Sequence, residues 1–179
     1  MERGDELQKT RRELTREGFE GKFPHLWLTR ELDEDERAPS SFNTLAFDAR
    51  RTIAMGKRLK TEITSGMLTR LRIDPGRYGL YSVAKTNANP WSDRIMVGRA
   101  SNNDVVFRHE SVSKVHAYFH RNPDGGWRVH DAKSANGTRV DGASVIPSGD
   151  GIEVRSGSLV SFGSLTCEVV ASADLYDVL

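Results

Sequence analysis

The chain has 179 residues, which is enough for one well-packed domain with an extension or for two small domains. Its formal net charge is +1, so no overall field attracts nucleic acid or an acidic membrane surface. No apolar run approaches the roughly 18 residues of a membrane-spanning helix, and charged residues follow the first methionine, so we expect no membrane insertion. The single cysteine, Cys167, excludes an intrachain disulfide, and we expect a cytoplasmic protein with Cys167 in its core.

Residues 1–76 are expected to form an N-terminal extension that is partly helical. Leu7 and Leu14 lie one heptad apart in a charge-dense stretch, and so thin an apolar stripe predicts a helix that is marginal on its own. A denser apolar group at 19–28 is expected to pack on another part of the protein. The acidic run at 33–36 indicates a solvated link.

A stronger helical pattern begins near Ser41. Five apolar residues share one helix face at positions i, i+3, i+4, i+7 and i+11: Phe42, Leu45, Ala46, Ala49 and Ile53. Basic residues lie toward its later part, where cations suit the helix dipole: Arg50, Arg51, Lys57, Arg58 and Lys60. Two interpretations stay open, because these cations form either a solvated face of a packed helix or a docking patch for an acidic partner.

The pattern changes over residues 77–171, where short apolar runs alternate with turn signals. The turn signals recur at the roughly 8–12 residue spacing that is typical of sandwiches and barrels. Asp141-Gly142, for example, has the residue types that tolerate positive φ in a tight hairpin. We therefore predict an all-β fold, a two-sheet antiparallel β-sandwich, followed by a C-terminal tail over 172–179.

Three polar clusters between these runs together supply the chemistry of an anion site. Arg99 offers a planar fork of donors that matches phosphate oxygens in pairs. Ser113 adds a short, directional contact, with the cation of Lys114 next to it. Asn136 has both a donor and an acceptor, so it can pair with a peptide backbone and read a chain rather than a free ion. Loops on a rigid sandwich hold such groups in place before a ligand arrives, which lowers the entropic cost of binding.

These residues resemble the signature of the forkhead-associated (FHA) domain in its bacterial form. The matching segments are Gly98-Arg99, Asn103-Asp104-Val105, Ser113-Lys114-Val115-His116, Ser134-Ala135-Asn136-Gly137-Thr138 with Gly142, and Ser148-Gly149-Asp150-Gly151-Ile152. The likeness covers about residues 78–170 and leaves the extension outside. It implies a two-sheet β-sandwich that reads phosphothreonine peptides with loops at one end.

The resemblance also implies a role for each matching residue. Arg99 and Ser113 would bind the phosphate with Lys114 beside them, and Asn136 would hold the peptide main chain. The other residues assigned to the main chain or to specificity are Ser134, Ala135 and Ser111. Structural support of the site falls to Gly98, His116, Gly137 and Thr138. The family commonly has threonine in place of Ala135, so a backbone N–H or Lys114 would have to replace the lost hydroxyl.

Two further patterns lack the partners that their chemistry needs. His116 and His120 have the spacing of a helical metal pair, but on a strand the same spacing separates them by roughly 13 Å. The segment from Ser111 to Lys114 fits the Ser-x-x-Lys pattern of penicillin-recognising acyl enzymes, but the sequence has no Ser-Asp-Asn or Lys-Thr-Gly element. We therefore expect no metal, no cofactor and no catalytic residue.

The sequence predicts a non-catalytic adaptor that recognises phosphothreonine peptides in Ser/Thr kinase signalling. Its expected partner is a phosphothreonine-containing protein, either a kinase or a kinase substrate. Two alternatives stay open. One is a phosphate-independent assembly scaffold. The other is self-regulation, in which a phosphorylated threonine of the extension (Thr10, Thr15, Thr44 or Thr69) binds the site, because a tether raises its effective concentration.

Overall fold

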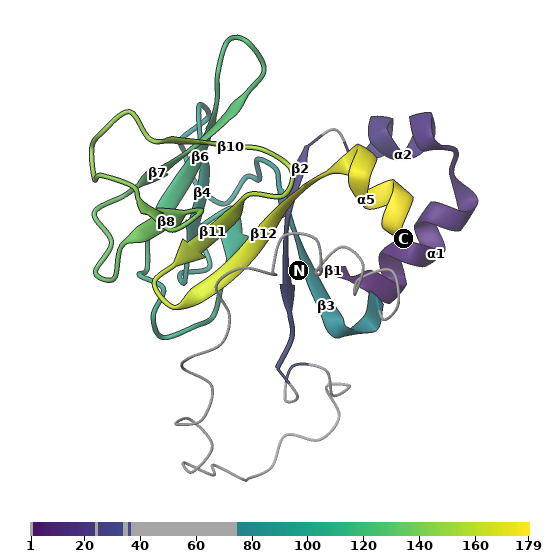
Figure 1. The fold of residues 1–179 in the computed structure, drawn as a ribbon, viewed down its shortest axis with the longest axis horizontal. Helices are drawn as coiled ribbons and strands as arrows, with labels where there is room; N and C mark the ends of the chain where they lie inside the picture. Colours follow the sequence, from purple (N-terminus) through teal and green to yellow (C-terminus); the bar gives the residue numbers. More distant parts are fainter. Residues whose placement is uncertain (1, 24, 34–35, 37–74) are drawn as a thin grey trace, which may run out of the picture.

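The computed structural model describes residues 2–23, 25–33, 36 and 75–179. The helix that the sequence predicts from Ser41, with its basic residues, lies outside the described residues. The ribbon shows two packed sheets with helices against the outside of one of them (Figure 1). None of the helices described is long and apolar enough to cross a membrane.

Two sheets form the sandwich. The seven-stranded sheet has the order β1 (Glu2–Arg3), β3 (Tyr78–Val83), β2 (Leu26–Glu31), β12 (Leu165–Ala171), β11 (Leu159–Phe162), β8 (Thr138–Val140), β9 (Ala143–Ser144). The five-stranded sheet has the order β10 (Ile152–Val154), β7 (Trp127–Asp131), β6 (Ala117–Arg121), β4 (Ile95–Gly98), β5 (Val105–Val106). The predicted all-β sandwich is confirmed, and the short β4–β5 pair is parallel where only antiparallel pairs were expected.

Apolar side chains that alternate along the strands fill the space between the sheets. On β12, Leu165, Cys167 and Val169 belong to this core, and on β11 Val160 and Phe162 do the same. Cys167 is fully buried, as the sequence predicts, and burial raises the pKa of its thiol to about 12. The period of two along each strand is what separates core positions from outer positions.

Strand β2 corrects the predicted boundary between an extension and a sandwich that begins at residue 77. It lies inside the seven-stranded sheet, hydrogen-bonded to β3 on one side and to β12 on the other. Leu26 and Leu28 pack in the core between the sheets, whereas Trp27 packs on the outer face. A strand buried on both faces has consecutive apolar residues instead of an alternating pattern, which is why its period is hidden in the sequence. Residues 33–74 therefore connect two neighbouring strands of the sandwich.

Three helices pack on the outer face of the seven-stranded sheet (Figure 1): α1 (Gly4–Glu13), α2 (Arg16–Lys22) and α5 (Ser172–Val178). They share a second core with outward-facing residues of the sheet. The helices contribute Leu7, Phe19 and Leu175, and the sheet contributes Trp27, Tyr78, Leu80 and Val170. The predicted tail over 172–179 is thus mostly a helix, because Leu175 is buried in this core. The helix predicted around Leu7 also forms, stabilised by the packing that its thin apolar stripe could not supply alone.

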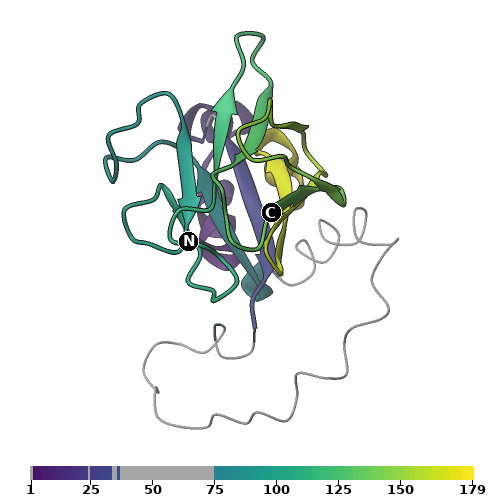
Figure 2. The ribbon, with the colours of Figure 1, turned by 90° about the vertical axis from the view of Figure 1, so that its left-hand side faces the viewer.

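Strand direction decides which loops meet at each end of the sandwich. β4 and β7 end where β6 and β8 begin, and the β11–β12 turn lies at this same end. The β6–β7 hairpin, the highest loop in Figures 1 and 2, projects from the opposite end. The predicted Asp141-Gly142 turn joins β8 to β9 with φ angles of 48° and 85°, as a tight hairpin requires.

A short 3-10 helix, η1 (Pro75–Arg77), leads into β3. Leu32, just after β2, donates its N–H to the carbonyl of Arg77 at 2.9 Å, so the chain closes the β2–β3 pair at this point.

Candidate functional site

Four loops converge at one end of the sandwich, and hydrogen bonds join them. They are the β4–β5 loop (99–104), the β5–β6 loop (107–116), the β7–β8 loop (132–137) and the β11–β12 turn (163–164). The Arg99 N–H donates to the Ser113 carbonyl, and the Gly163 N–H donates to the Gly137 carbonyl, both at 2.9 Å. Segments that are far apart in sequence therefore lie side by side.

Arg99 is exposed at the start of the β4–β5 loop. Its Nε donates to the carbonyl of Val112 at 3.1 Å, which directs the guanidinium along the β5–β6 loop. Among the residues that the structure describes, none accepts a hydrogen bond from its two terminal nitrogens. A guanidinium tethered at Nε can present this pair of donors to two oxygens of one anion. Lys114 is also exposed, on the loop that Arg99 contacts.

The hydroxyl of Ser113 bridges two loops. Its Oγ accepts a hydrogen bond from the N–H of Ala135 at 3.0 Å. A hydroxyl that accepts in this way still carries its own proton, which it can donate to an anion. Ala135, which lacks the hydroxyl common in the family, therefore contributes its backbone N–H by positioning Ser113.

His116 is buried beneath the loops and connects two of them. Its Nδ1 accepts from the N–H of Ser113 at 3.0 Å, so Nε2 carries the proton and donates to the carbonyl of Gly137 at 3.2 Å. Burial lowers the pKa of His116, which favours this neutral form. Phe162 packs edge-on against the imidazole, with ring centroids 5.7 Å apart.

Gly98 and Asn103 both lie against the carbonyl of Lys114. A Cβ on Gly98 would lie 2.4 Å from that carbonyl oxygen, so a larger residue would displace the loop. The side chain of Asn103 is only 3% exposed and donates to the carbonyls of Lys114 and Ala100, both at 2.7 Å. The sequence places Asn103 in the FHA-like pattern but assigns it no role. The structure shows that it holds the β4–β5 loop against the β5–β6 loop.

Asn136 is tied to the neighbouring loop through its side-chain nitrogen. Nδ2 donates to the carbonyl of Ser111 at 2.8 Å, while the side chain remains exposed. The Ser111 hydroxyl accepts from the N–H of Ser164 at 3.1 Å and lies 2.8 Å from Nδ1 of His109. An amide held by its nitrogen leaves its oxygen to accept an N–H, as in pairing with a peptide main chain.

Asp131 organises the β7–β8 loop from inside. Its carboxylate accepts from the hydroxyls of Thr138 at 2.6 Å and Ser134 at 2.7 Å, and from the N–H of Ser134 at 3.0 Å. Burial by itself would raise the pKa of Asp131, but these hydrogen bonds outweigh it and hold the pKa below the usual value. The sequence signal that could have found this role is the Asp-x-x-Ser spacing, because an aspartate commonly closes such a turn on its own backbone.

The structure brings all the residues predicted for the site into these loops or the strand ends beside them. Arg99, Lys114 and Asn136 are exposed, whereas His116 and Thr138 are buried under them. What the exposed residues bind stays a prediction.

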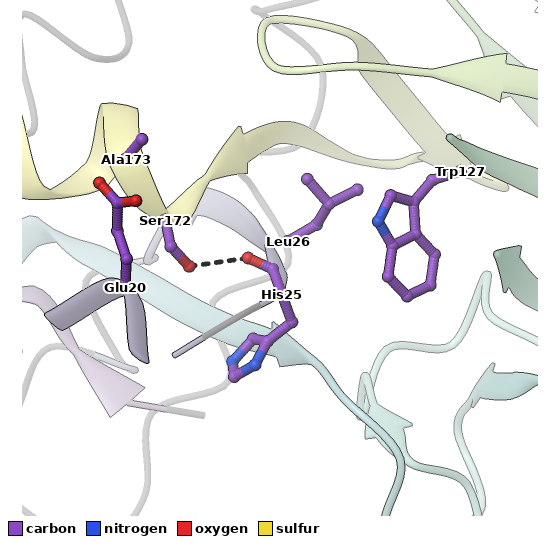
Figure 3. Close-up of a pocket in the computed structure, with 6 residues that line it drawn as sticks. All are labelled: Glu20, His25, Leu26, Trp127, Ser172 and Ala173. Carbon is purple, nitrogen blue, oxygen red and sulfur yellow. Dashed lines mark hydrogen bonds between the residues drawn. The ribbon is translucent and has the colours of Figure 1, made fainter. Parts of the chain in front are cut away.

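A hollow of about 320 Å³ lies toward the opposite end, beside α2 and α5 (Figure 3). Its lining combines apolar and polar residues: Glu20, His25, Leu26, Trp127, Ser172 and Ala173. The Ser172 hydroxyl donates to the carbonyl of His25 at 2.7 Å and accepts from the indole N–H of Trp27 at 3.2 Å. These polar groups hold α5 against β2, and the hollow is separate from the converging loops.

Within the described residues, no group of three or more His, Cys, Asp or Glu side chains is placed to hold a metal ion. His116 uses both ring nitrogens in hydrogen bonds to the backbone. His120 instead meets His130 on the neighbouring strand, with ring centroids 6.3 Å apart and nearly perpendicular planes.

Comparison with known proteins identifies one part of the chain. Residues 95–163 match the model of the FHA domain family. No curated protein matches the chain.

Solved structures resemble about half of the chain. Mycobacterium tuberculosis EmbR, in complex with a low-affinity phosphopeptide, is 18% identical over 55% of this chain and 23% of its own, with a TM-score of 0.41. The FHA-2 domain from a Mycobacterium tuberculosis ABC transporter is 32% identical over 46% of this chain and 71% of its own, with a TM-score of 0.36. The N-terminal FHA domain of an S. cerevisiae protein, in complex with a phosphothreonine peptide, is 17% identical over 56% of this chain and 90% of its own, with a TM-score of 0.44.

Proposed function

Residues 95–163 belong to the FHA domain family, and on this premise we propose that the chain binds phosphothreonine-containing peptides at the four converging loops. One observation supports the proposal most strongly. Hydrogen bonds between the loops bring a guanidinium, a serine hydroxyl and a side-chain amide to one end of the sandwich. These groups suit phosphate oxygens and a peptide main chain.

In this proposal, Arg99, Ser113 and Lys114 bind the phosphate. A phosphothreonine carries about −1.5 to −2 charges at pH 7 and three strong acceptor oxygens. Arg99 offers two parallel donors, Ser113 offers one hydroxyl proton, and Lys114 adds a flexible point charge. An unmodified threonine has neither the charge nor the oxygens, so binding depends on phosphorylation.

The peptide main chain pairs with Asn136 beside the phosphate. Ser134 commits its hydroxyl to Asp131, so Ala135 and Asn136 are the residues of this loop that face a ligand. Ser111 lies next to Asn136, because its carbonyl accepts a hydrogen bond from the Asn136 side chain. It therefore contacts the same peptide from the neighbouring loop.

We further propose that the protein is a non-catalytic adaptor in cytoplasmic Ser/Thr kinase signalling. The hydroxyl of Ser113 accepts from a backbone N–H, and His116 directs both nitrogens to the backbone. His116 is therefore not available as a general base for the hydroxyl of Ser113, a pairing that nucleophilic catalysis at this residue would need. The partner is a protein that carries a phosphothreonine, either a kinase or its substrate.

Calorimetry with a degenerate phosphothreonine peptide library and its unphosphorylated twin tests the proposal. We expect heat of binding from the phosphorylated library alone, lost after phosphatase treatment of the peptides. Equal binding of both libraries would contradict phosphate recognition and support the assembly scaffold.

One observation favours a second candidate function, binding of the protein's own segment 33–74. β2 runs antiparallel to β12, which starts at the β11–β12 turn, so β2 ends and β3 begins beside the four loops. The two ends of this segment are therefore at the same end of the sandwich as the four loops. Thr44 and Thr69 are two of the segment's five threonines, and a tether of this kind raises the local concentration of a phosphothreonine.

Phosphorylation by a Ser/Thr kinase in vitro, followed by mass spectrometry, tests this second candidate. We expect phosphate within 33–74 and weaker binding of the peptide library by the phosphorylated protein, restored in the Thr44→Ala/Thr69→Ala double variant. Peptide binding that is unchanged by phosphate on this segment would exclude it. Thr15 is a poorer candidate, because its hydroxyl already accepts from the N–H of Gly18 at the start of α2.

A further inference from the structure

Ile146 is the most exposed large apolar side chain in the part of the chain that the structure describes. Its exposed fraction is 73%, compared with 45% for Trp91 and 36% for Val115. A single exposed isoleucine is common on protein surfaces, so its meaning depends on where it lies and how it is held.

Ile146 lies beside the proposed peptide site. The N–H of Val145 donates to the carbonyl of Thr138 at 2.9 Å, which continues the β8–β9 pairing by one step. Ile146 follows Val145 directly, just as Gly137 precedes Thr138, so Ile146 lies at the same end of β8 as Gly137, the neighbour of Asn136.

The order of strands places Ile146 on one definite side of the site. β8 lies between β11 and β9 in the seven-stranded sheet. The β11–β12 turn, which contacts Ser111, therefore flanks the start of β8 on one side, and Ile146 flanks it on the other. A peptide that crosses Asn136 in an extended conformation meets polar groups at Ser111 along one flank and an apolar side chain along the other.

The loop that carries Ile146 is anchored. The N–H of Gly149 donates to the carbonyl of Ile146 at 3.0 Å, and Ser148 between them has a φ of 61°. The carbonyl of Gly149 lies 3.3 Å from Nδ1 of His130, and Arg128 donates to the carbonyl of Asp150 at 2.9 Å. Two side chains of β7 thus fix this loop, so Ile146 is presented to solvent without the freedom of a loose loop. A preorganised contact surface loses less entropy on binding.

We propose that Ile146 determines specificity, by packing against an apolar side chain on the flank of the phosphothreonine peptide that crosses β9. This inference rests on the proposed function, since it names which peptides the same site selects. The phosphate supplies the common part of the affinity through Arg99, and Ile146 supplies a preference that lies on one flank only.

Two peptide libraries, degenerate on either the N-terminal or the C-terminal flank of a fixed phosphothreonine, test the inference. We expect the wild type to enrich Leu, Ile, Val, Met or Phe on one flank only. Ile146→Ser should reduce that enrichment about fivefold or more and retain binding to a phosphopeptide without apolar flanking residues. Ile146→Leu should restore the enrichment. Trp91→Ser is the matched control, because it removes an exposed apolar side chain from the loop between β3 and β4 at the opposite end.

Thermal unfolding shows whether each variant is folded, and we expect no change because Ile146 is exposed. Phosphopeptide binding without a flank preference, or with a preference that Ile146→Ser leaves intact, would overturn this inference and leave the proposed function standing. A wild type that binds no phosphothreonine peptide would overturn both.

Discussion

The two ends of the sandwich use their hydrogen bonds differently. At the loop end, buried residues such as His116 and Asp131 satisfy the backbone and leave Arg99 and Asn136 exposed with unused groups. At the opposite end, Ser172 uses its hydroxyl to hold α5 against β2. Both ends are polar and both are held together by side chains. The contrast indicates that buried side chains stabilise the loop end. The hydrogen-bonding groups of the exposed residues therefore remain available for the ligand that we propose there.

Replacing Arg99, the main cation of the proposed site, tests the contrast between the two ends most directly. Arg99→Ala should weaken binding of a phosphothreonine peptide about 100-fold, because hydrogen bonds to a charged group contribute about 1.5–3 kcal/mol. The melting temperature should not change, since Arg99 is exposed. Calorimetry measures the affinity, and Arg155→Ala removes an exposed arginine from the turn between β10 and β11 as a control. Unchanged affinity in Arg99→Ala would remove this residue from the site.

The strand that links the two ends carries a pH-dependent group. Glu168 on β12 is fully buried, and no described residue hydrogen-bonds its carboxyl group. Burial raises the pKa of Glu168 to about 7, above the ordinary value of 4.5, so near neutral pH the folded state holds a proton that the unfolded state has lost. The contribution to stability is present below about pH 4.5 and disappears as the pH rises through 7.

Glu168→Gln should therefore be more stable than the wild type at pH 8, by about 3 kcal/mol at roughly 1.4 kcal/mol per pKa unit. The difference should shrink at pH 5. Urea unfolding at both pH values measures it, with the exposed glutamate of β10 changed in Glu153→Gln as the control. An equal difference at pH 5 and pH 8 would show that ionisation of Glu168 is not the cause.

Removing the buried histidine should damage the loop end as a whole. His116→Ala leaves the N–H of Ser113 and the carbonyl of Gly137 without their partner, at a cost of about 2 kcal/mol in the free energy of unfolding. Peptide affinity should fall as well, because Ser113 and Asn136 lose their shared support. Because burial lowers the pKa of His116, its contribution in the wild type is present above about pH 6.5 and is lost as the pH falls below that value. Denaturant titrations at pH 7.5 and 5.5 should show this dependence weakened in the variant.

The matching change at the opposite end should separate stability from binding. Ser172→Ala removes the acceptor of the Trp27 indole N–H and the donor to the carbonyl of His25. We expect a loss of about 1.5 kcal/mol in stability, with an unchanged dissociation constant for the phosphothreonine library. A change in peptide affinity as large as that of His116→Ala would mean that the two ends are coupled.

The smallest expected effect comes from Ser113. Ser113→Ala deletes one hydrogen bond to the phosphate and leaves the cation of Arg99 in place, so affinity should fall about fivefold, or about 1 kcal/mol. The variant also loses the acceptor for the N–H of Ala135. A Ser113→Thr variant, which keeps the hydroxyl, should bind like the wild type if the hydroxyl is the group that matters.

Local patterns in the sequence predicted the sandwich and the loops well. Asp141-Gly142 specifies its hairpin through two residues that accept positive φ, and strands such as β11 show their core face through alternation. The turn and the strand faces depend on neighbours in sequence, so residue order alone is enough to recognise them. The convergence of Arg99, Ser113 and Asn136 joins distant segments, and it was expected from the family resemblance.

What the sequence hides depends on distant partners. Leu26, Trp27 and Leu28 form a strand only because β3 and β12 lie on either side and helices cover one face. Asn103 supports the site by donating to the carbonyl of Lys114, a contact between two loops rather than between neighbours in the sequence. The segment expected to be a tail forms α5, because Leu175 is buried in the second core.

The central place of β2 matters for how the chain is made. One of its neighbours is β12, which is synthesised after the other described strands of this sheet, so the seven-stranded sheet stays open along that edge until β12 has been made. Until then the nascent β2–β3 pair exposes unpaired backbone groups, which is the kind of edge on which other chains can aggregate. A gene truncated before β12 would yield a product with that edge permanently open, and a fragment beginning at β3 would lack the strand that bridges the sheet.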